Sequence, residues 1–262
     1  MKNLFYSIFL LISVFSCKEA SSQKDITNPS NIPKIDTISY KLERISKEFG
    51  DCVNEGLKCA KATVQFVNLP QKYPNINTTI QNIIKGNAPN IEAALDSFVL
   101  EGKTFFEEIP EAPGGYALDL EQTVILNTVK LLTIQEESYT YTGGAHGNYG
   151  TTFYNFDIQN GKQIDLKDIL QTDYESSLKA IAEPIFQKTY LEEEMTSYAE
   201  AGFYFKNDQF TLTDNFAITK EGLKFVYNPY EIAPYVMGQQ EILIPFNLIE
   251  GLMKNIGLIN SL

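Results

Sequence analysis

The stretch YALDLEQTVILNTVKLLTIQEESYTYTGGAHGNYGTTFYNFD, residues 116–157, decides the fold of this 262-residue chain. Apolar and polar residues alternate through most of it, and this alternation is the period of a half-buried β-strand. The residue types that strands favour, such as Thr, Tyr, Val and Ile, are frequent in it. Because Asn160-Gly161, a two-residue turn signal, follows, the region predicts three or four antiparallel strands.

Before this stretch, the sequence predicts two strands and then two helices. Residues 38–49 and 61–69 have the mixed or alternating pattern of strands, and they flank a short segment with two cysteines. Residues 76–84 and 90–108 have helical spacing, and Asn90 is a favourable N-cap for the second helix. These elements therefore predict a hairpin followed by a helical pair.

After this stretch, two helices and then three strands are predicted. A short helix begins near Asp165, and a longer one runs from Tyr174 to about Leu191 with Pro184 as a possible point of kinking or division. The predicted strands and the terminal helix occupy residues 215–219, 223–227, 240–245 and 246–254. The strands and helices are segregated and do not repeat as βαβ units. The predicted fold class is therefore α+β, with antiparallel sheets, segregated helices and two subdomains, residues 37–130 and 131–262.

The first residues predict a bacterial lipoprotein signal peptide, residues 1–16. Lys2 precedes an apolar run that is too short to span a membrane, and the run ends in Val-Phe-Ser-Cys, which resembles a lipobox. Cys17 is then the lipidated residue, and residues 17–36, rich in Ser, Asn, Pro and Lys, form a tether. We expect a lipid-anchored protein of the cell envelope, in the outer membrane, on its periplasmic side or at the cell surface. The alternative is an ordinary secretory signal with an incidental cysteine.

The other two cysteines, Cys52 and Cys59, lie close together in the sequence. Outside the cytoplasm such a pair favours a disulfide, which contributes about 2–3 kcal/mol by restricting the unfolded chain. Free thiols are the alternative. The pair has no further ligands nearby in sequence, so it is a poor metal site.

The composition limits the partners. The chain has 33 acidic and 21 basic residues and a formal net charge of −12, which argues against nucleic acid and against an anionic membrane surface. It suits a basic partner. The alternative is that the acidic balance only keeps the protein soluble.

Common catalytic and metal-binding patterns are missing from the sequence. His146 is the single histidine, whereas common zinc sites need two or three histidines or several cysteines. There is no G-x-S-x-G nucleophile elbow and no phosphate-binding loop. We therefore assign no catalytic residue and expect neither a metal nor another cofactor.

The loop around His146 is the first candidate for ligand binding. Its candidate residues are Tyr141, Gly143, Gly144, His146, Gly147 and Asp157. The three glycines either supply positive φ angles at a bend between strands or form a backbone nest for a ligand. Both interpretations remain open at this point, with the turn favoured.

Two motifs resemble a known family. The first is YTGGAHG, residues 141–147, followed by Asn155-Phe-Asp157. The second is FVYNPYEIAPY, residues 225–235, which contains Asn228, Pro229, Tyr230, Glu231, Pro234 and Tyr235. Together they resemble an extracytoplasmic domain of unknown function. That domain forms the extracellular part of the anti-sigma factor RsiV and precedes the catalytic domain of PdaC-type peptidoglycan deacetylases. The similarity covers about residues 139–252, and residues 37–130 resemble the domain that commonly comes before it.

The resemblance implies an α+β extracytoplasmic fold and a binding role. In RsiV this region binds lysozyme, and in PdaC-type enzymes catalysis lies in a separate domain. No lysozyme-contacting residue can be carried over from the motifs. Since neither a sigma-binding segment nor a deacetylase domain is found in this sequence, we expect neither signalling nor deacetylation here.

Three functional hypotheses follow. The first is a non-enzymatic binding module on a lipid anchor, with lysozyme or peptidoglycan as its partner. The second is an enzyme that acts on cell-wall glycans through His146, and the third is a structural lipoprotein of the envelope. The sequence leaves the oligomeric state open.

Overall fold

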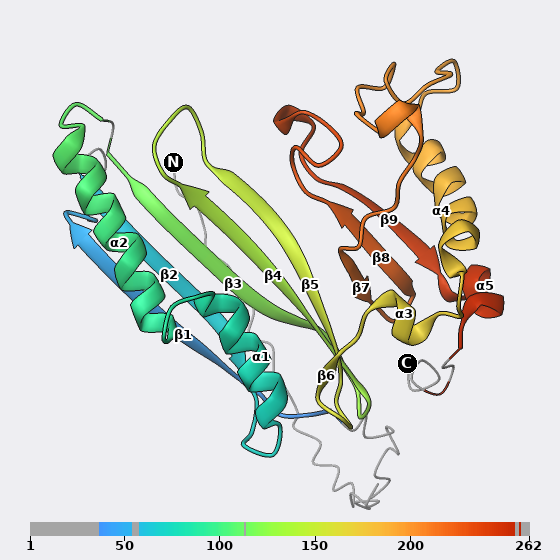
Figure 1. Ribbon diagram of the computed structural model, residues 1–262, viewed down its shortest axis with the longest axis horizontal. Coiled ribbons are helices and arrows are strands. Elements are labelled where there is room, and N and C mark those ends of the chain that lie inside the picture. The colour runs from blue at the N-terminus through green and yellow to red at the C-terminus, as the bar shows by residue number, and fades with distance from the viewer. Residues whose placement is uncertain (1–36, 54–57, 113, 255–256, 258–262) are drawn as a thin grey trace, which may run out of the picture. The chain divides into compact units, whose positions relative to one another are not determined.

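The computed structural model describes residues 37–53, 58–112, 114–254 and 257 (Figure 1). The predicted signal peptide, Cys17 and the whole predicted tether fall in residues 1–36, which lie outside the described residues. No helix among the described residues is long and apolar enough to cross a membrane.

Two sheets and a set of separate helices confirm the α+β class. The larger sheet contains, in spatial order, β1 (Lys41–Gly50), β2 (Cys59–Asn68), β3 (Tyr116–Asn127), β4 (Leu131–Tyr141), β5 (Asn148–Asp157) and β6 (Lys162–Gln163). The smaller sheet contains β7 (Phe216–Ile218), β8 (Gly222–Tyr227) and β9 (Gln240–Pro245). Neighbouring strands are antiparallel except for β2 and β3, which are parallel. This exception arises because a helical pair connects β2 to β3 and returns the chain to the same end of the sheet.

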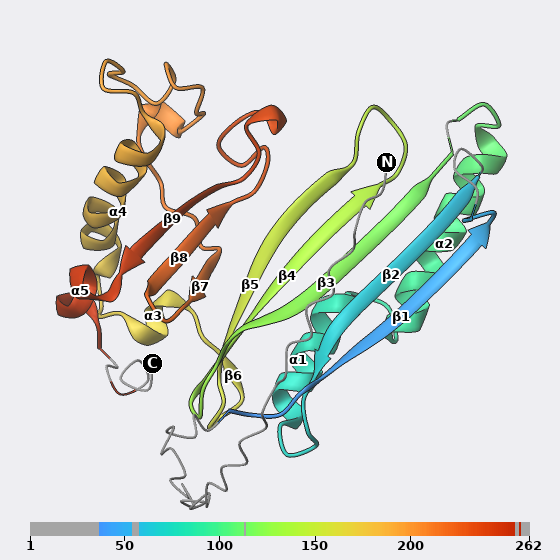
Figure 2. The same ribbon diagram turned by 180° about the vertical axis from the view of Figure 1, so that it is seen from behind.

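That helical pair, α1 (Pro74–Lys85) and α2 (Ile91–Glu108), covers one face of the larger sheet (Figures 1 and 2). The side chain of Asn90 caps α2 as predicted, because its Oδ1 accepts a hydrogen bond of 2.8 Å from the Ala93 amide. Apolar residues from both helices pack on alternate residues of the strands. The buried members of this core include Ile80, Leu95, Val64, Ile134 and Phe156.

The smaller sheet packs with α4 (Tyr174–Tyr190) around a second core that is rich in aromatic rings. Phe186, on α4, is fully buried at its centre and contacts Phe203 and Phe210. The helix is continuous across Pro184, so this proline does not divide it. The remaining helices are short: α3 (Leu166–Ile169), α5 (Phe246–Ile249), η1 (Lys206–Asp208), η2 (Tyr235–Met237) and η3 (Glu250–Leu252).

The two turns predicted from the sequence are found at the predicted positions, but one of them is longer than expected. Cys52 and Cys59 form the predicted disulfide, which closes the connection between β1 and β2 with a Cα–Cα distance of 4.9 Å. The Asn160-Gly161 turn joins β5 to β6, and it comprises the four residues 158–161 where a two-residue turn was expected.

The boundary predicted between residues 130 and 131 falls in the turn between β3 and β4. These strands are neighbours in the larger sheet, so this sheet is continuous across that position. Alternation in a sequence indicates where strands are, and it contains no direct information about which strands share a sheet.

Candidate functional site

Asparagine side chains join the edge of β5 to the smaller sheet. Asn155, on β5, accepts a 2.7 Å hydrogen bond from the Ile218 amide and donates one of 2.8 Å to the Phe216 carbonyl. Asn215 in turn accepts from the Phe153 amide at 3.1 Å and donates to the Thr151 carbonyl at 2.8 Å. These side chains satisfy main-chain groups that an edge strand would otherwise leave open.

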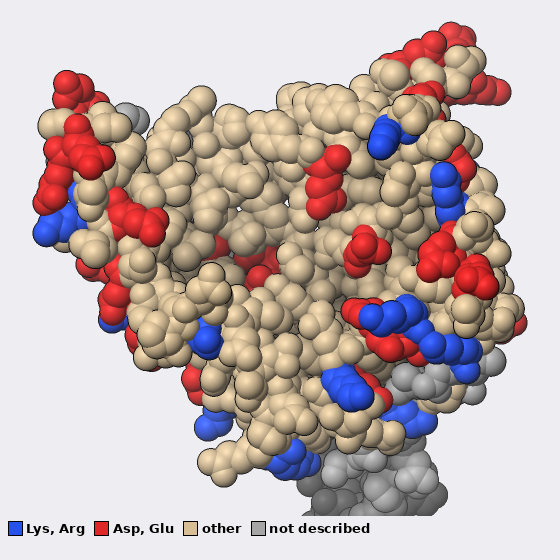
Figure 3. All heavy atoms as spheres, viewed as in Figure 1, with Lys and Arg blue, Asp and Glu red and all other residues tan. Residues whose placement is uncertain are grey.

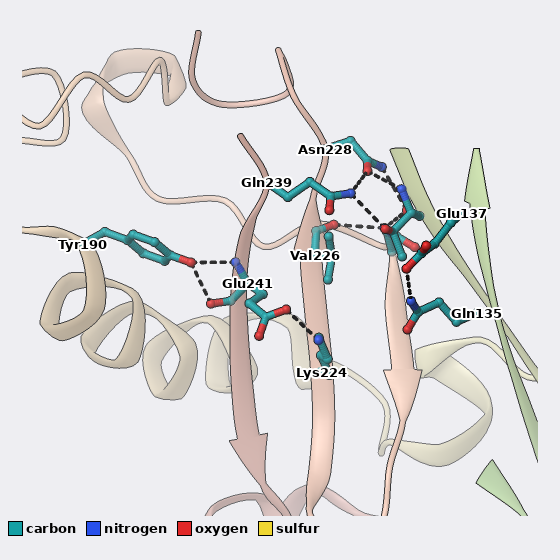
Figure 4. Close-up of polar contacts among 10 residues, drawn as sticks. Gln135, Glu137, Tyr190, Lys224, Val226, Asn228, Gln239 and Glu241 are labelled. Atoms are coloured by element: carbon teal, nitrogen blue, oxygen red, sulfur yellow. Dashed lines mark hydrogen bonds and ion pairs between the residues drawn. The ribbon is translucent and has the colours of Figure 1, made fainter. Parts of the chain in front are cut away.

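A third asparagine belongs to the second sequence motif. The Asn228 Oδ1 accepts from the Thr151 amide at 2.7 Å, and its Nδ2 donates to the Thr151 carbonyl at 3.0 Å. Gln239 donates to the Asn228 Oδ1 at 2.8 Å and to the Thr151 hydroxyl at 2.9 Å. In Figure 4, Asn228 and Gln239 extend from the smaller sheet toward the strand that carries Gln135 and Glu137. The motif therefore holds the two sheets together.

The two sequence motifs meet at His146. Its ring stacks on Tyr235 with a centroid distance of 4.1 Å and an interplanar angle of 21°. Its Nδ1 lies 2.8 Å from the Gly147 carbonyl oxygen, and its Nε2 lies 3.4 Å from the Tyr230 hydroxyl. His146 is thus bound to the backbone and packed on an aromatic ring at an exposed position.

The glycines of the loop have two different roles. Gly143 and Gly144 have φ angles of +91° and +102°, which L-residues with a side chain rarely adopt. Gly147 is required by contact instead, because a Cβ atom there would lie 2.4 Å from the Tyr139 ring. The expectation that all three glycines supply positive φ is therefore correct for two of them. The Tyr141 hydroxyl donates to the Gly144 carbonyl at 3.0 Å and supports the turn.

Asp157 does not belong to this loop. It lies at the opposite end of β5, ten residues long, which places it about 30 Å from the His146 end of the strand. Its carboxylate accepts hydrogen bonds from the Gln159 amide and the Asn160 side chain, so it stabilises the turn before β6. Asp157 was predicted to lie near His146 because the two residues are close in sequence. The extended strand β5 instead places them at opposite ends of the sheet.

A cavity of about 350 Å³ opens beside the His146 loop, on the sheet face opposite α1 and α2. We call it the acidic hollow. Its lining residues are Asp119, Glu121, Glu137, Ser138, Tyr139, Tyr149, Gly150, Thr151 and Gln239. Glu121 and Glu137 are directly opposite each other on β3 and β4, and Asp119 is opposite Tyr139. Such a like-charged pair across two strands is destabilising by itself.

No lysine or arginine neutralises the acidic hollow among the described residues. Its carboxylates form no ion pair there, whereas five other carboxylates of the described chain do. Gln65 donates to Glu121 at 3.0 Å, and Gln135 donates to Glu137 at 2.7 Å. The amide groups of Gln65 and Gln135 orient the carboxylates of Glu121 and Glu137. Because the amides are neutral, they do not neutralise the negative charge of these carboxylates.

Exposed aromatic and apolar side chains surround the loop next to the acidic hollow. Tyr230 is 55% exposed, and Val236 is 89% exposed. Tyr235 contacts both Tyr149 and Tyr230, with centroid distances of 5.6 Å in each case. We call Tyr139, His146, Tyr230, Tyr235 and Val236 the aromatic rim. Figure 3 shows mainly uncharged atoms over the β4–β5 and β8–β9 loops.

A buried carboxylate lies on the other face of the same strand. Glu136 accepts hydrogen bonds from Gln122 at 2.8 Å and from the Tyr154 hydroxyl at 3.1 Å. Burial raises the pKa of Glu136, and the two hydrogen bonds oppose this only in part. Burial and the nearby Glu136 also raise the pKa of Tyr154. Since this network lies against the helix-covered core, it belongs to the structural side of the sheet.

Among the described residues, no three His, Cys, Asp or Glu side chains come together as metal ligands. The residues of the acidic hollow were not singled out from the sequence. They come from β3, β4, β5 and the segment before β9, and only the strand register places them together. Glu136 and Glu137 are neighbours in the sequence, but their side chains point to opposite faces of the sheet.

The fold and the site thus define a two-sheet α+β module with an open, acidic sheet face. Comparison with known proteins shows what each part of the chain is similar to. Residues 167–247 match a family model described as "Protein of unknown function (DUF3298)", and residues 53–149 match one described as "Deacetylase PdaC". The His146 loop lies in the second region and the Asn228–Tyr235 motif in the first. The PdaC match ends at residue 149 and the DUF3298 match begins at residue 167, so the interval between them comes after the boundary predicted at residue 130.

One curated protein is similar to about half of the chain. The peptidoglycan-N-acetylmuramic acid deacetylase PdaC of Bacillus subtilis is 24% identical over 139 residues, which are 52% of this chain and 29% of that enzyme. The chain therefore matches less than a third of that enzyme's length.

Two solved structures have the same fold. A DUF3298 family member from Bacteroides fragilis is 22% identical, with a TM-score of 0.66 over 86% of this chain and 98% of its own. A DUF3298 family protein from Pseudomonas aeruginosa is 24% identical, with a TM-score of 0.63 over 84% of this chain and 96% of its own.

Proposed function

We propose that the protein is a non-enzymatic binding module of the cell envelope, and that the acidic hollow and the aromatic rim bind a basic cell-wall-active protein such as lysozyme. The observation that carries this proposal is the set of uncompensated carboxylates Asp119, Glu121 and Glu137 on an open sheet face. A cationic side chain that enters the acidic hollow relieves the repulsion between Glu121 and Glu137. The rings of Tyr139 and Tyr149 line the same cavity and favour cations through their faces.

The aromatic rim supplies the apolar part of such an interface. Protein interfaces are enriched in exposed tyrosines, which bury large areas while their hydroxyls remain hydrogen-bonded. The net charge of −12 adds long-range attraction for a basic partner and raises the association rate. The resemblance to the lysozyme-binding region of RsiV makes lysozyme the first partner to test.

The contacts of His146 favour binding over catalysis. A general base needs a free nitrogen near a reacting group and an orienting partner such as a carboxylate. Here Nδ1 faces the Gly147 carbonyl, Nε2 lies 3.4 Å from the Tyr230 hydroxyl, and the ring is covered on one side by Tyr235. Among the described residues no carboxylate bonds to the His146 ring. His146 therefore acts as a packing residue of the aromatic rim in this proposal.

The test is calorimetric titration of purified protein with lysozyme at about 50 mM and about 500 mM salt. We expect binding that weakens at high salt and a dissociation constant at least about tenfold higher for Glu121→Gln/Glu137→Gln. The matched control is Glu92→Gln/Glu108→Gln, which removes the same charge from exposed positions of α2. Absence of binding at low salt, or equal loss in the control, contradicts the proposal. Cosedimentation with purified peptidoglycan sacculi in place of lysozyme assigns the surface to the second predicted ligand.

We also propose that Cys17 attaches the module to the outer membrane by a lipid. The support for the lipid is the lipobox-like sequence before Cys17. The match to a Bacillus subtilis enzyme whose name places its substrate in peptidoglycan supports a place in the cell envelope. Labelling of cells with a radioactive fatty acid should mark the wild-type protein and leave Cys17→Ser unlabelled. Equal labelling of both proteins contradicts the anchor at Cys17.

A further inference from the structure

The strand β1 is an edge of the larger sheet, and no described residue bonds its outward main chain between residues 41 and 48. It pairs with β2 over all ten residues without a bulge. Among the described residues, the main chain of residues 41–48 forms hydrogen bonds only with β2. Open edges of this length are ready to pair with another strand, and proteins usually cover them.

The other long edges of this molecule are covered by specific side chains. Asn215 and Asn228 bond the outer main chain of β5 at Phe153 and Thr151. Asn155, on β5, bonds the main chain of β7 at Ile218. The Tyr190 hydroxyl donates to the Glu241 carbonyl at 3.0 Å and accepts from the Glu241 amide at 2.6 Å, which covers the edge of β9 (Figure 4). The contrast makes β1 the edge of the described chain that is open to a partner.

Three side chains of β1, those of Leu42, Arg44 and Phe49, are of types found at interfaces, and they stand beside two lysines and two glutamates on the same strand. Arg44 is the only arginine in the 262 residues, it is exposed, and it forms no ion pair with any described residue. Leu42 and Phe49, on the same strand, are 48% and 41% exposed. Arginine and exposed apolar residues are typical of protein interfaces, whereas lysine and glutamate are typical of free surfaces.

The sequence of β1 is complementary to itself in one antiparallel register. A two-fold axis through Ser46 places Arg44 of each copy opposite Glu48 of the other, and places Leu42 opposite Gly50. Arg44, Ser46 and Glu48 lie on the same sheet face, because side chains alternate along a strand. Glu48 is available for this pair, since its only ion pair is at 3.9 Å from the Lys61 Nζ. An axis through Ile45 instead places Arg44 opposite Ser46 and leaves the arginine unpaired.

We propose that β1 pairs with β1 of a second copy of this chain, and that the resulting dimer has one continuous sheet across the two-fold axis. The partner is a second copy because the register that satisfies Arg44 satisfies both copies at once, as an isologous interface requires. A two-fold axis perpendicular to the sheet leaves both acidic hollows on the same face. The proposal holds whether or not the acidic hollow binds lysozyme.

The test is a charge exchange across the axis, measured by light scattering after size-exclusion chromatography of the full chain with Cys17→Ser. Wild type should be a dimer whose mass falls on dilution. Arg44→Glu and Glu48→Arg should each raise the dimer dissociation constant at least about tenfold, since each creates a like-charged pair on either side of the axis. The double variant Arg44→Glu/Glu48→Arg should restore the dimer, and Lys220→Glu, at an exposed turn, should have no effect.

A cross-linking experiment tests the register. Ser46→Cys should form a covalent dimer under mild oxidation, because residue 46 is opposite its own copy. Glu43→Cys should not, because residue 43 is opposite Phe49 in the same register. A monomeric wild type, a double variant that fails to restore the dimer, or a lack of cross-linking through residue 46 overturns the proposal.

Discussion

The two faces of the larger sheet come from the same strands and carry opposite kinds of residues. On one face, Ile134 and Phe156 are buried under the helices together with Val64. On the other face, Glu137, directly after Glu136 in sequence, opens to solvent in the acidic hollow. Because successive side chains of a strand point to opposite faces, the residues that stabilise the fold and the residues that are open to a ligand lie on different faces. Substitutions on one face can therefore change stability, and substitutions on the other can change binding, independently.

The largest effect should come from the covered face. Phe156, on β5, is fully buried in the core that the larger sheet forms with the helices. Phe156→Ala should therefore lower the free energy of unfolding by about 3–5 kcal/mol. Thr123→Ala, on the open face, should change it by less than about 0.5 kcal/mol. Urea unfolding followed by circular dichroism measures both. Similar values for the two variants would remove the distinction between the faces.

A smaller effect is expected at the junction of the two sheets. Asn155 is 2% exposed, and Asn155→Ala leaves the Ile218 amide and the Phe216 carbonyl without partners. We expect a loss of about 2–4 kcal/mol in the free energy of unfolding, because two buried main-chain groups are then unsatisfied. Asn148→Ala, an exposed position on the same strand, is the control. Hydrogen exchange at the Ile218 amide should also accelerate in Asn155→Ala, and unchanged exchange contradicts the role given to this side chain.

The buried Glu136 gives the covered face a dependence on pH. Its pKa in the folded protein is raised above the ordinary value of 4.5, so the folded state binds a proton that the unfolded state has released. The stabilisation by this proton is fully present below the unfolded value and is lost as the pH rises through the folded value. The stability of wild type relative to Glu136→Gln should therefore fall as the pH rises from about 4.5. Melting temperatures of both proteins across this range measure it, and a constant difference refutes it.

The smallest effect on stability should come from the open face. Glu121→Gln removes one charge of the like-charged pair with Glu137, so the free energy of unfolding should rise by about 0.2–1 kcal/mol. Glu193→Gln, at an exposed position of the turn after α4, should leave the free energy of unfolding unchanged within error. Guanidine is unsuitable because it screens charge, so urea unfolding at low salt is the measurement. A destabilised Glu121→Gln would mean that these two carboxylates do not repel each other.

Much of the fold could be predicted from local pattern. The strands, both long helices, the Asn90 cap and the Cys52–Cys59 disulfide depend on residues that are neighbours in sequence. The parallel pairing of β2 with β3 and the continuity of the sheet across residue 130 depend on which strands meet, and neither follows from periodicity.

The site was predictable only in part for the same reason. The motifs around His146 and Asn228 were visible in the sequence, but the stacking of His146 on Tyr235 joins residues that are far apart in it. Asp157 was misplaced because a strand carried it to the far end of the sheet. Asp119, Glu121 and Glu137 come together only through the register of β3 and β4, which no single segment reveals.

The most direct test of the binding face measures stability and affinity on one pair of proteins. Lysozyme is titrated into wild type and into Glu121→Gln/Glu137→Gln at low salt, and the urea stability of both proteins is measured in the same buffer. The predicted result is opposite signs, with the variant more stable and its dissociation constant for lysozyme at least about tenfold higher. Equal lysozyme affinity of the two proteins, with or without a gain in stability, would contradict the assignment of the acidic hollow as the binding site.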